Sequence, residues 1–433
     1  MFAGPFLPIR EEPPKLVCHF DRSGEILPAA SFRSRRSKCR QIRDVRLIRN
    51  GSPKATRWYH SRVVTDLQPP QESAESPVQP SAPPARGWLF SALVTLARTL
   101  VALLVALAAT VVTIRLAHGD VRLALVSLWQ GAFGGNYAIG TTLIKTIPLL
   151  LTGLGVAIAF RAQMFNIGGE GQFLVGGLLA SFVALNIPAT QHLTSPILIT
   201  LMMLVGVLAG ATWAGMAAVL KVSRGVPEVI STIMLNFVAV EVLSYLVNGP
   251  MERLDHSQPA TDALPDSASL PILWSGTPLH AGLIIALAAA AIVWVMMNRT
   301  VLGFSIDIVG ANPITARIAG YSVSRTIIVA MLWSGALCGL AGAVELSGVV
   351  GFIPEGYSPG YGYTAIAVAL LGRLSVVGVV FSALLFGALS AGSDNMERTA
   401  GIGHELGYVI QAVALLVLLA SQWNGWSRVV RRP

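Results

Sequence analysis

Long apolar runs separated by short polar connections follow one another from residue 88 to near the C-terminal end of the chain. A helix rises about 1.5 Å per residue, so about 20 residues cross the roughly 30 Å hydrocarbon layer of a bilayer. Ten such segments can be read from the sequence: 88–114, 139–160, 165–186, 196–220, 227–248, 280–299, 325–347, 358–372, 374–392 and 405–422. The pattern predicts an all-α fold, a polytopic membrane helix bundle of about ten transmembrane helices.

Two apolar stretches fit this pattern less well. Segment 358–372 is the weakest of the ten because it opens with Ser-Pro-Gly-Tyr-Gly-Tyr. The stretch 121–133 is shorter, and we expect it at the membrane surface rather than across the bilayer. Composition supports a membrane protein: 53% of the 433 residues are hydrophobic and 12% are charged, against about 25% charged in soluble domains. Contiguous apolar runs exclude an outer-membrane barrel of short alternating strands.

The basic residues of the connections predict the orientation, because Lys and Arg concentrate on the cytoplasmic side. With the N-terminus inside, ten of them fall on the inner side: Arg161, Lys221, Arg224, Arg299, Arg317, Arg325, Arg373, Arg428, Arg431 and Arg432. Four fall on the outer side: Arg115, Arg122, Arg253 and Arg398. Both termini are therefore expected in the cytoplasm.

Residues 1–86 differ from the rest in charge and composition. They hold 15 Lys and Arg against 8 Asp and Glu, so most of the net charge of +9 lies there. Lacking helical or strand periodicity, this Pro-, Ser- and Arg-rich stretch is expected to be a disordered extension of a membrane domain at 87–433. A basic patch for lipid headgroups or nucleic acid is the other reading, and we expect no nucleic-acid partner. A further hypothesis places the start of translation downstream, between Val63 and Val78.

The stretch Phe165–Phe173 is the most unusual at membrane depth, because it contains Asn166, Glu170 and Gln172. An acid at a helix centre costs about 2.5–3.5 kcal/mol, while each Leu or Ile returns only about 0.3–0.6 kcal/mol. Asn166 and Glu170 are i,i+4 neighbours and share a helix face. They form either the polar lining of a translocation path or a buried hydrogen-bond network that fixes the preceding turn.

Other ionisable residues in the spans have simpler expectations. Lys145 and Glu170 lie about 14 Å apart in depth, too far for an ion pair. Asp394 has no partner that the sequence reveals in a neighbouring span, and Glu345 is expected to be a hydrated charge near a helix end.

Motifs for catalysis, metals and nucleotides are missing from the sequence. His404-Glu405 is not followed by a His at position 408, and no Gly-x-x-x-x-Gly-Lys-Ser/Thr occurs. Three scattered cysteines favour neither a disulfide nor a zinc framework. We therefore expect no catalytic site, metal or cofactor in this chain, and any ATP-driven motor must be another polypeptide.

The long inner connection 300–324 predicts a short helix on the cytoplasmic surface. Asn312 suits an N-cap, Pro313 the first helical position and Gly320 the end of a helix. The residues of interest are mostly small, and small side chains allow close insertion into a groove of a partner: Gly310, Ala311, Asn312, Pro313, Ala316, Arg317, Ala319 and Gly320. An interfacial connector with no partner is the alternative.

Several ordered blocks resemble the membrane permeases of nucleoside-type ABC importers, which are relatives of the ribose and branched-chain amino-acid permeases. The blocks are Gly153–Ala162, Phe165–Gln172, Pro227–Asn236, Leu246–Pro250, Val309–Pro313, Ser334–Ala343 and Gly362–Arg373. The resemblance covers roughly 88–430 and has no counterpart for the N-terminal extension.

The resemblance implies a multi-pass permease of the inner membrane for nucleosides, with simple sugars or branched-chain amino acids as alternatives. It implies three partners: an ATP-binding subunit, a second permease subunit and an extracytoplasmic substrate-binding lipoprotein. The 310–320 helix would couple to the ATPase, and the outer connection 249–279 would receive the lipoprotein. Pathway candidates are Asn166, Glu170, Gln172 and Asn236. The rival class is an ion-coupled secondary transporter that uses Glu170 or Glu241.

Overall fold

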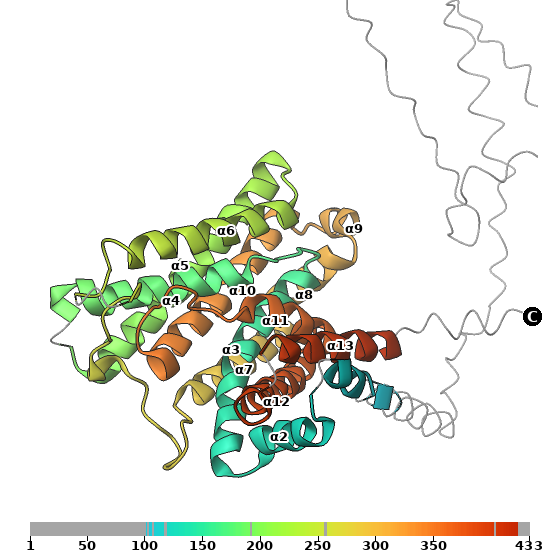
Figure 1. Cartoon of the computed structure of the whole chain (residues 1–433). Helices are drawn as coiled ribbons and strands as arrows, with labels where there is room; N and C mark the ends of the chain where they lie inside the picture. The colour runs from blue at the N-terminus through green and yellow to red at the C-terminus, as the bar shows by residue number, and fades with distance from the viewer. Residues whose placement is uncertain are drawn as a thin grey trace, which may run out of the picture. The chain divides into compact units, whose positions relative to one another are not determined.

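The computed structural model describes residues 119–190, 193–254, 258–401 and 404–422, together with the helical residues 101, 104–105 and 108–116 (Figure 1). The expected extension at 1–86, its boundary with the membrane domain and most of the segment 88–114 lie outside these residues.

The described part of the chain is helical, and no named strand occurs in it. The helices are α2 (Val121–Phe133), α3 (Asn136–Arg161), α4 (Gly169–Asn186), α5 (Ser195–Arg224), α6 (Glu228–Val247), α7 (Gly282–Arg299), α8 (Val301–Ala311), α9 (Pro313–Ile318), α10 (Val323–Glu345), α11 (Tyr361–Leu371), α12 (Val376–Ala400) and α13 (His404–Gln422). Among them, six are long and apolar enough to cross a membrane: α3, α5, α6, α7, α12, and α10 with its extension to Val350. The predicted all-α membrane bundle is confirmed.

Helices α3 and α10 form the centre of the bundle. Every residue of α3 from Thr146 to Ala159 is buried, as expected of a helix that is apolar on all sides. Helix α10 packs against α3, α4 and α5, and α12 packs against α3 and α2. These contacts bring residues far apart in the sequence together inside the membrane-embedded part.

Helices α5 and α10 approach each other through glycines. A Cβ atom on Gly335 would meet the carbonyl oxygen of Gly210, and one on Gly339 would meet that of Gly206. The two backbones are therefore in direct contact, the arrangement that small residues permit between membrane helices.

Two helices begin inside the protein. Helix α4 starts only at Gly169, after a non-helical segment that follows the end of α3. Helix α11 has 11 residues, so it is about 17 Å long and cannot cross the hydrocarbon layer alone. The segment expected to span at 358–372 is thus half a span, because Gly356 and Gly360 take left-handed backbone conformations (φ 75° and 87°) that break the helix before Tyr361.

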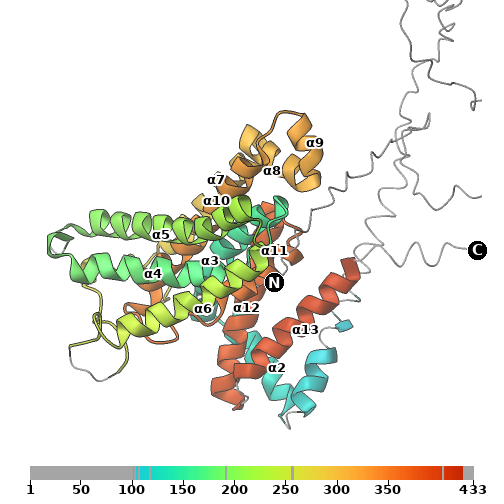
Figure 2. The same cartoon turned by 90° about the horizontal axis from the view of Figure 1, so that it is seen from above.

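Helices α8 and α9 lie together at one end of α7 and α10 (Figure 2). The connection between α6 and α7 instead folds over the far end of α10. There Leu270 N–H donates to the Ser347 carbonyl at 2.8 Å, and Thr261 N–H donates to the Ile353 carbonyl at 3.0 Å.

Candidate functional site

The four pathway candidates lie in one buried cluster. Asn166, Gln172 and Asn236 are at most 1% exposed, and Glu170 is 5% exposed. They come from the segment before α4, from the first turn of α4, and from α6. The structure therefore brings all four together at the point where α4 begins.

Asn166 and Gln172 form a reciprocal amide pair. Each side-chain NH2 donates to the other's oxygen at 3.0 Å. Asn166 Nδ2 also donates to Ser334 Oγ of α10 at 2.9 Å, and Asn166 Oδ1 accepts from Gly168 N–H at 2.9 Å. The pair fixes the turn before α4 against the central helix.

Asn236 connects α6 to the same turn. Its Oδ1 accepts from the backbone N–H of Gly171 at 2.9 Å, and its Nδ2 donates to the Ile167 carbonyl at 2.9 Å. The same Nδ2 reaches the Tyr363 hydroxyl of α11 at 3.3 Å. One amide thus satisfies a free N–H of the α4 N-terminus, which has no partner within its own helix.

Glu170 caps the N-terminus of α11. Its Oε2 accepts from Gly362 N–H at 2.7 Å, and the Ser358 side chain and the backbone N–H groups of Gly360 and Tyr363 lie close enough to stabilise this carboxylate. A Cβ on Gly362 would meet the backbone nitrogen of Glu170, so only glycine lets the two helices approach this closely. A negative charge stabilises helix N-termini, where unpaired N–H groups point outward.

The structure thus separates residues that sequence spacing placed on one face. Asn166 bonds towards α10 and Glu170 bonds towards α11, and the described contacts include no hydrogen bond between the two. Burial and full hydrogen bonding are what the network interpretation requires. The pathway role of these residues stays a proposal.

Lys145 forms an ion pair with Asp394 of α12, with Nζ and Oδ2 separated by 3.1 Å. The expectation that Asp394 has no partner is therefore wrong, because α3 and α12 pack side by side. The expected absence of a Lys145–Glu170 pair agrees with this geometry. Glu345 is only 6% exposed and accepts from the Tyr361 hydroxyl at 3.4 Å, so the expectation of a hydrated charge is also wrong.

The predicted helix boundaries at α9 are confirmed. Asn312 Oδ1 accepts from the N–H groups of Ile314 and Thr315 at 2.9 and 3.1 Å, and Pro313 is the first helical residue. Gly320 follows the helix with a left-handed φ of 87°. Most of the candidate coupling residues are exposed: Ala311, Asn312, Pro313, Arg317, Ala319 and Gly320.

Two of the coupling candidates face inward instead. Ala316 is buried, and so is Gly310, on which a Cβ would meet the backbone oxygen of Arg161. Arg161 also binds Asp307 of α8 through two hydrogen bonds of 2.7 and 2.5 Å. Gly310 therefore serves the packing of α8 on α3, and a bulky residue there would disturb this contact before any contact with a partner.

Sequence reasoning missed the two most conspicuous residues of α9. Ile314 and Ile318 are 71% and 82% exposed and lie one helical turn apart. Their i,i+4 spacing in an otherwise small-residue helix was the available signal. Among the described residues, no cluster of His, Cys, Asp and Glu could hold a metal ion.

Comparison with known proteins places this sequence among transport proteins. The sequence model of the family "Branched-chain amino acid transport system / permease component" matches residues 138–419. The guanosine ABC transporter permease protein NupP of Bacillus subtilis is 38% identical over 74% of this chain and 92% of its own length. The glucose ABC transporter permease protein TsgB13 of Haloferax volcanii is 38% identical over 66% of this chain and 77% of its own length. The nucleoside ABC transporter permease protein NupB of Lactococcus lactis is 34% identical over 67% of this chain and 81% of its own length.

Proposed function

Because this chain belongs to the family of branched-chain amino acid transport system permease components, we propose that it is the membrane-spanning permease subunit of an ATP-driven importer for nucleosides. It is a multi-pass protein of the inner membrane, and a transport subunit rather than an enzyme. The observation that supports nucleosides as the cargo is the 38% identity to a guanosine permease across 92% of that protein. A glucose permease of equal identity makes simple sugars the second candidate, and the family description makes branched-chain amino acids the third.

The proposed topology has about ten transmembrane helices with both termini in the cytoplasm. Six long apolar helices support it, and α4 and α13 have 18 and 19 residues. Basic residues at the ends of α3, α5 and α7 support the orientation, since all three helices then end inside. The connection between α6 and α7 then faces the extracytoplasmic lipoprotein.

We place the ATP-binding subunit, a separate polypeptide, against α8 and α9. The exposed Ile314 and Ile318 present an apolar surface at the cytoplasmic end. The Arg161–Asp307 pair and the Gly310 contact tie this surface to α3, so displacement of α9 is transmitted to the central helix. A second permease subunit completes the proposed complex.

The pathway role of Asn166, Glu170, Gln172 and Asn236 takes a specific form in this proposal. These residues hold the starts of α4 and α11 together. A path that opens between the two helices must break their hydrogen bonds and expose the amides and the carboxylate. Amides and carboxylates then match the hydroxyls and base edges of a nucleoside.

The test is transport by the complex assembled from this chain and the ATPase, second permease and lipoprotein of its importer. In proteoliposomes we expect ATP-dependent uptake of [3H]guanosine that vanadate inhibits and an uncoupler does not. Unlabelled adenosine should compete, while glucose and leucine should not. Competition by glucose or leucine alone would overturn the cargo. Uphill accumulation by this chain alone would overturn the ABC mechanism in favour of ion coupling.

A further inference from the structure

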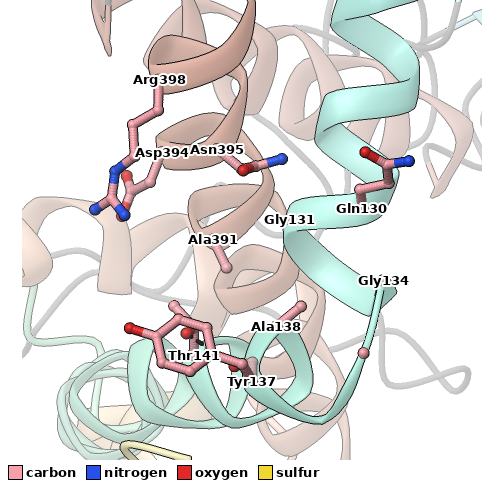
Figure 3. Close-up of a pocket in the computed structure, with 11 residues that line it drawn as sticks. Gln130, Gly131, Gly134, Tyr137, Ala138, Thr141, Ala391, Asp394, Asn395 and Arg398 are labelled. Carbon is pink, nitrogen blue, oxygen red and sulfur yellow. Dashed lines mark hydrogen bonds between the residues drawn. The ribbon is translucent and has the colours of Figure 1, made fainter.

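A pocket of about 290 Å³ lies between α2, the start of α3 and the end of α12 (Figure 3). Its lining is rich in polar groups, among them Gln130, Tyr137, Thr141, Asp394, Asn395 and Arg398. The volume is at the lower limit for small-molecule sites, which run from about 300 to 1,000 Å³. Under the proposed topology the pocket opens to the outside, because α3 begins and α12 ends there.

The Lys145–Asp394 ion pair forms the boundary between this pocket and a second cavity. Asp394 lines the pocket, whereas Lys145 lines the cavity, which has a volume of about 30 Å³. Tyr361, Ser390 and Gln411 also line the cavity, so α11, α12 and α13 contribute to it. This volume holds about one water molecule.

Both charges lie at membrane depth. Lys145 is nine residues from the start of α3, about 14 Å along the helix, and Asp394 is six residues from the end of α12, about 9 Å. Their side chains are 25% and 20% exposed. Ionisable residues at such depth are costly and mark substrate or ion pathways by default. An ion pair kept between two cavities is therefore better explained by function than by stability.

Gln411 of α13 adds a buried amide to the cavity. It is 8% exposed and lines the cavity together with Lys145 and Tyr361. A Gln side chain carries two N–H donors and one carbonyl acceptor. Gln411 therefore adds polar groups to the cavity wall beyond the ion pair.

We propose that the pocket and the cavity form the outer cargo site, which binds the ribose of a nucleoside through the Lys145–Asp394 pair. This inference rests on the proposed nucleoside transport. The vicinal hydroxyls of ribose can donate to the Asp394 carboxylate and accept from the Lys145 ammonium, so the sugar replaces the direct ion pair without changing the net charge. Tyr137, 64% exposed at the pocket wall, is placed to contact the base. Once the ion pair has separated, the Gln411 amide forms hydrogen bonds with the ribose hydroxyls.

The decisive experiment compares guanosine with 2′,3′-dideoxyguanosine, which lacks both hydroxyls. Maximal uptake rates are measured in the reconstituted complex at concentrations that saturate the lipoprotein, so that its own affinity does not enter. We expect Asp394→Asn to lower the guanosine rate at least about tenfold, as for a lost hydrogen bond to a charged group. The dideoxyguanosine rate should change less than about twofold. Glu241→Gln is the matched control, an exposed acid on α6 that does not line the pocket, and it should alter neither rate.

A second measurement does not depend on whether the Asp394→Asn variant folds. Thr141→Cys places a thiol on the pocket wall, and a membrane-impermeant methanethiosulfonate should label it in the permease–ATPase complex. Millimolar guanosine should slow this labelling, and dideoxyguanosine should not. Equal protection by both nucleosides, protection by neither, or an unchanged guanosine rate in Asp394→Asn would overturn the site. If the wild-type complex takes up no nucleoside at all, the proposed function fails instead.

Discussion

Replacing Glu170 tests whether its carboxylate holds the N-terminus of α11. Glu170→Ala removes the acceptor of Gly362 N–H and the interactions with Ser358, Gly360 and Tyr363. A hydrogen bond to a charged group is worth about 1.5–3 kcal/mol, and a buried N–H without a partner costs about 1–3 kcal/mol. We therefore expect Glu170→Ala to destabilise the protein by about 3 kcal/mol. Glu170→Gln keeps one acceptor oxygen and should cost about half as much.

Thermal unfolding of the purified complex in detergent, read beside uptake in proteoliposomes, measures both consequences. The midpoints should fall in the order wild type, Glu170→Gln, Glu170→Ala. Glu241→Gln is the control, because Glu241 is an exposed acid within α6, and it should leave stability and uptake unchanged. A wild-type midpoint in Glu170→Ala would refute the capping role. Lost uptake at wild-type stability and assembly would instead favour direct contact with the cargo.

Three further outcomes are expected. Ile314→Ser with Ile318→Ser should abolish lipoprotein-stimulated ATP hydrolysis and weaken pull-down of the ATPase while the permease still inserts, and unaltered stimulation would contradict docking at α9. Asp307→Asn should reduce uptake several-fold yet leave ATPase binding intact, because it breaks the link from α8 to Arg161, and co-purification with hydrolysis assays separates the two effects. Burial lowers the pKa of His280, in the connection before α7, to about 4. Between pH 6.5 and 4 the unfolded chain therefore binds a proton at His280 that the folded chain does not. The free energy of unfolding should fall on acidification through this range, by about 3 kcal/mol once pH 4 has been passed. His280→Gln should flatten the pH profile of the unfolding midpoint.

Helix boundaries set by neighbouring residues could be predicted from the sequence, and α9 shows why. An Asn N-cap, a Pro at the first helical position and a terminal Gly act within a few residues of each other, so Asn312, Pro313 and Gly320 predicted both ends of the helix. The run lengths likewise predicted α3 and α5. In these cases each residue carries the information about its own neighbourhood.

Hydrogen bonds and ion pairs between residues that are brought together only by tertiary packing could not be predicted from the sequence. Glu170 meets Gly362 across 192 positions, and Arg161 meets Asp307 across 146. Nothing in the spacing of α3 and α12 states that they pack side by side, so the partner of Asp394 was missed. The exposed isoleucines of α9 were also missed, because the prediction of a docking helix rested on its small residues alone.

The glycine seam between α5 and α10 has a mechanical consequence. Where two backbones touch, no side chain lies between them that could switch rotamer and let one helix slide past the other. We therefore expect α5 and α10 to move as one rigid body during transport. The conformational change then has to occur between other helices of the bundle. Engineered cross-links between α5 and α10 should leave uptake intact, whereas a cross-link between α3 and α12 should abolish uptake.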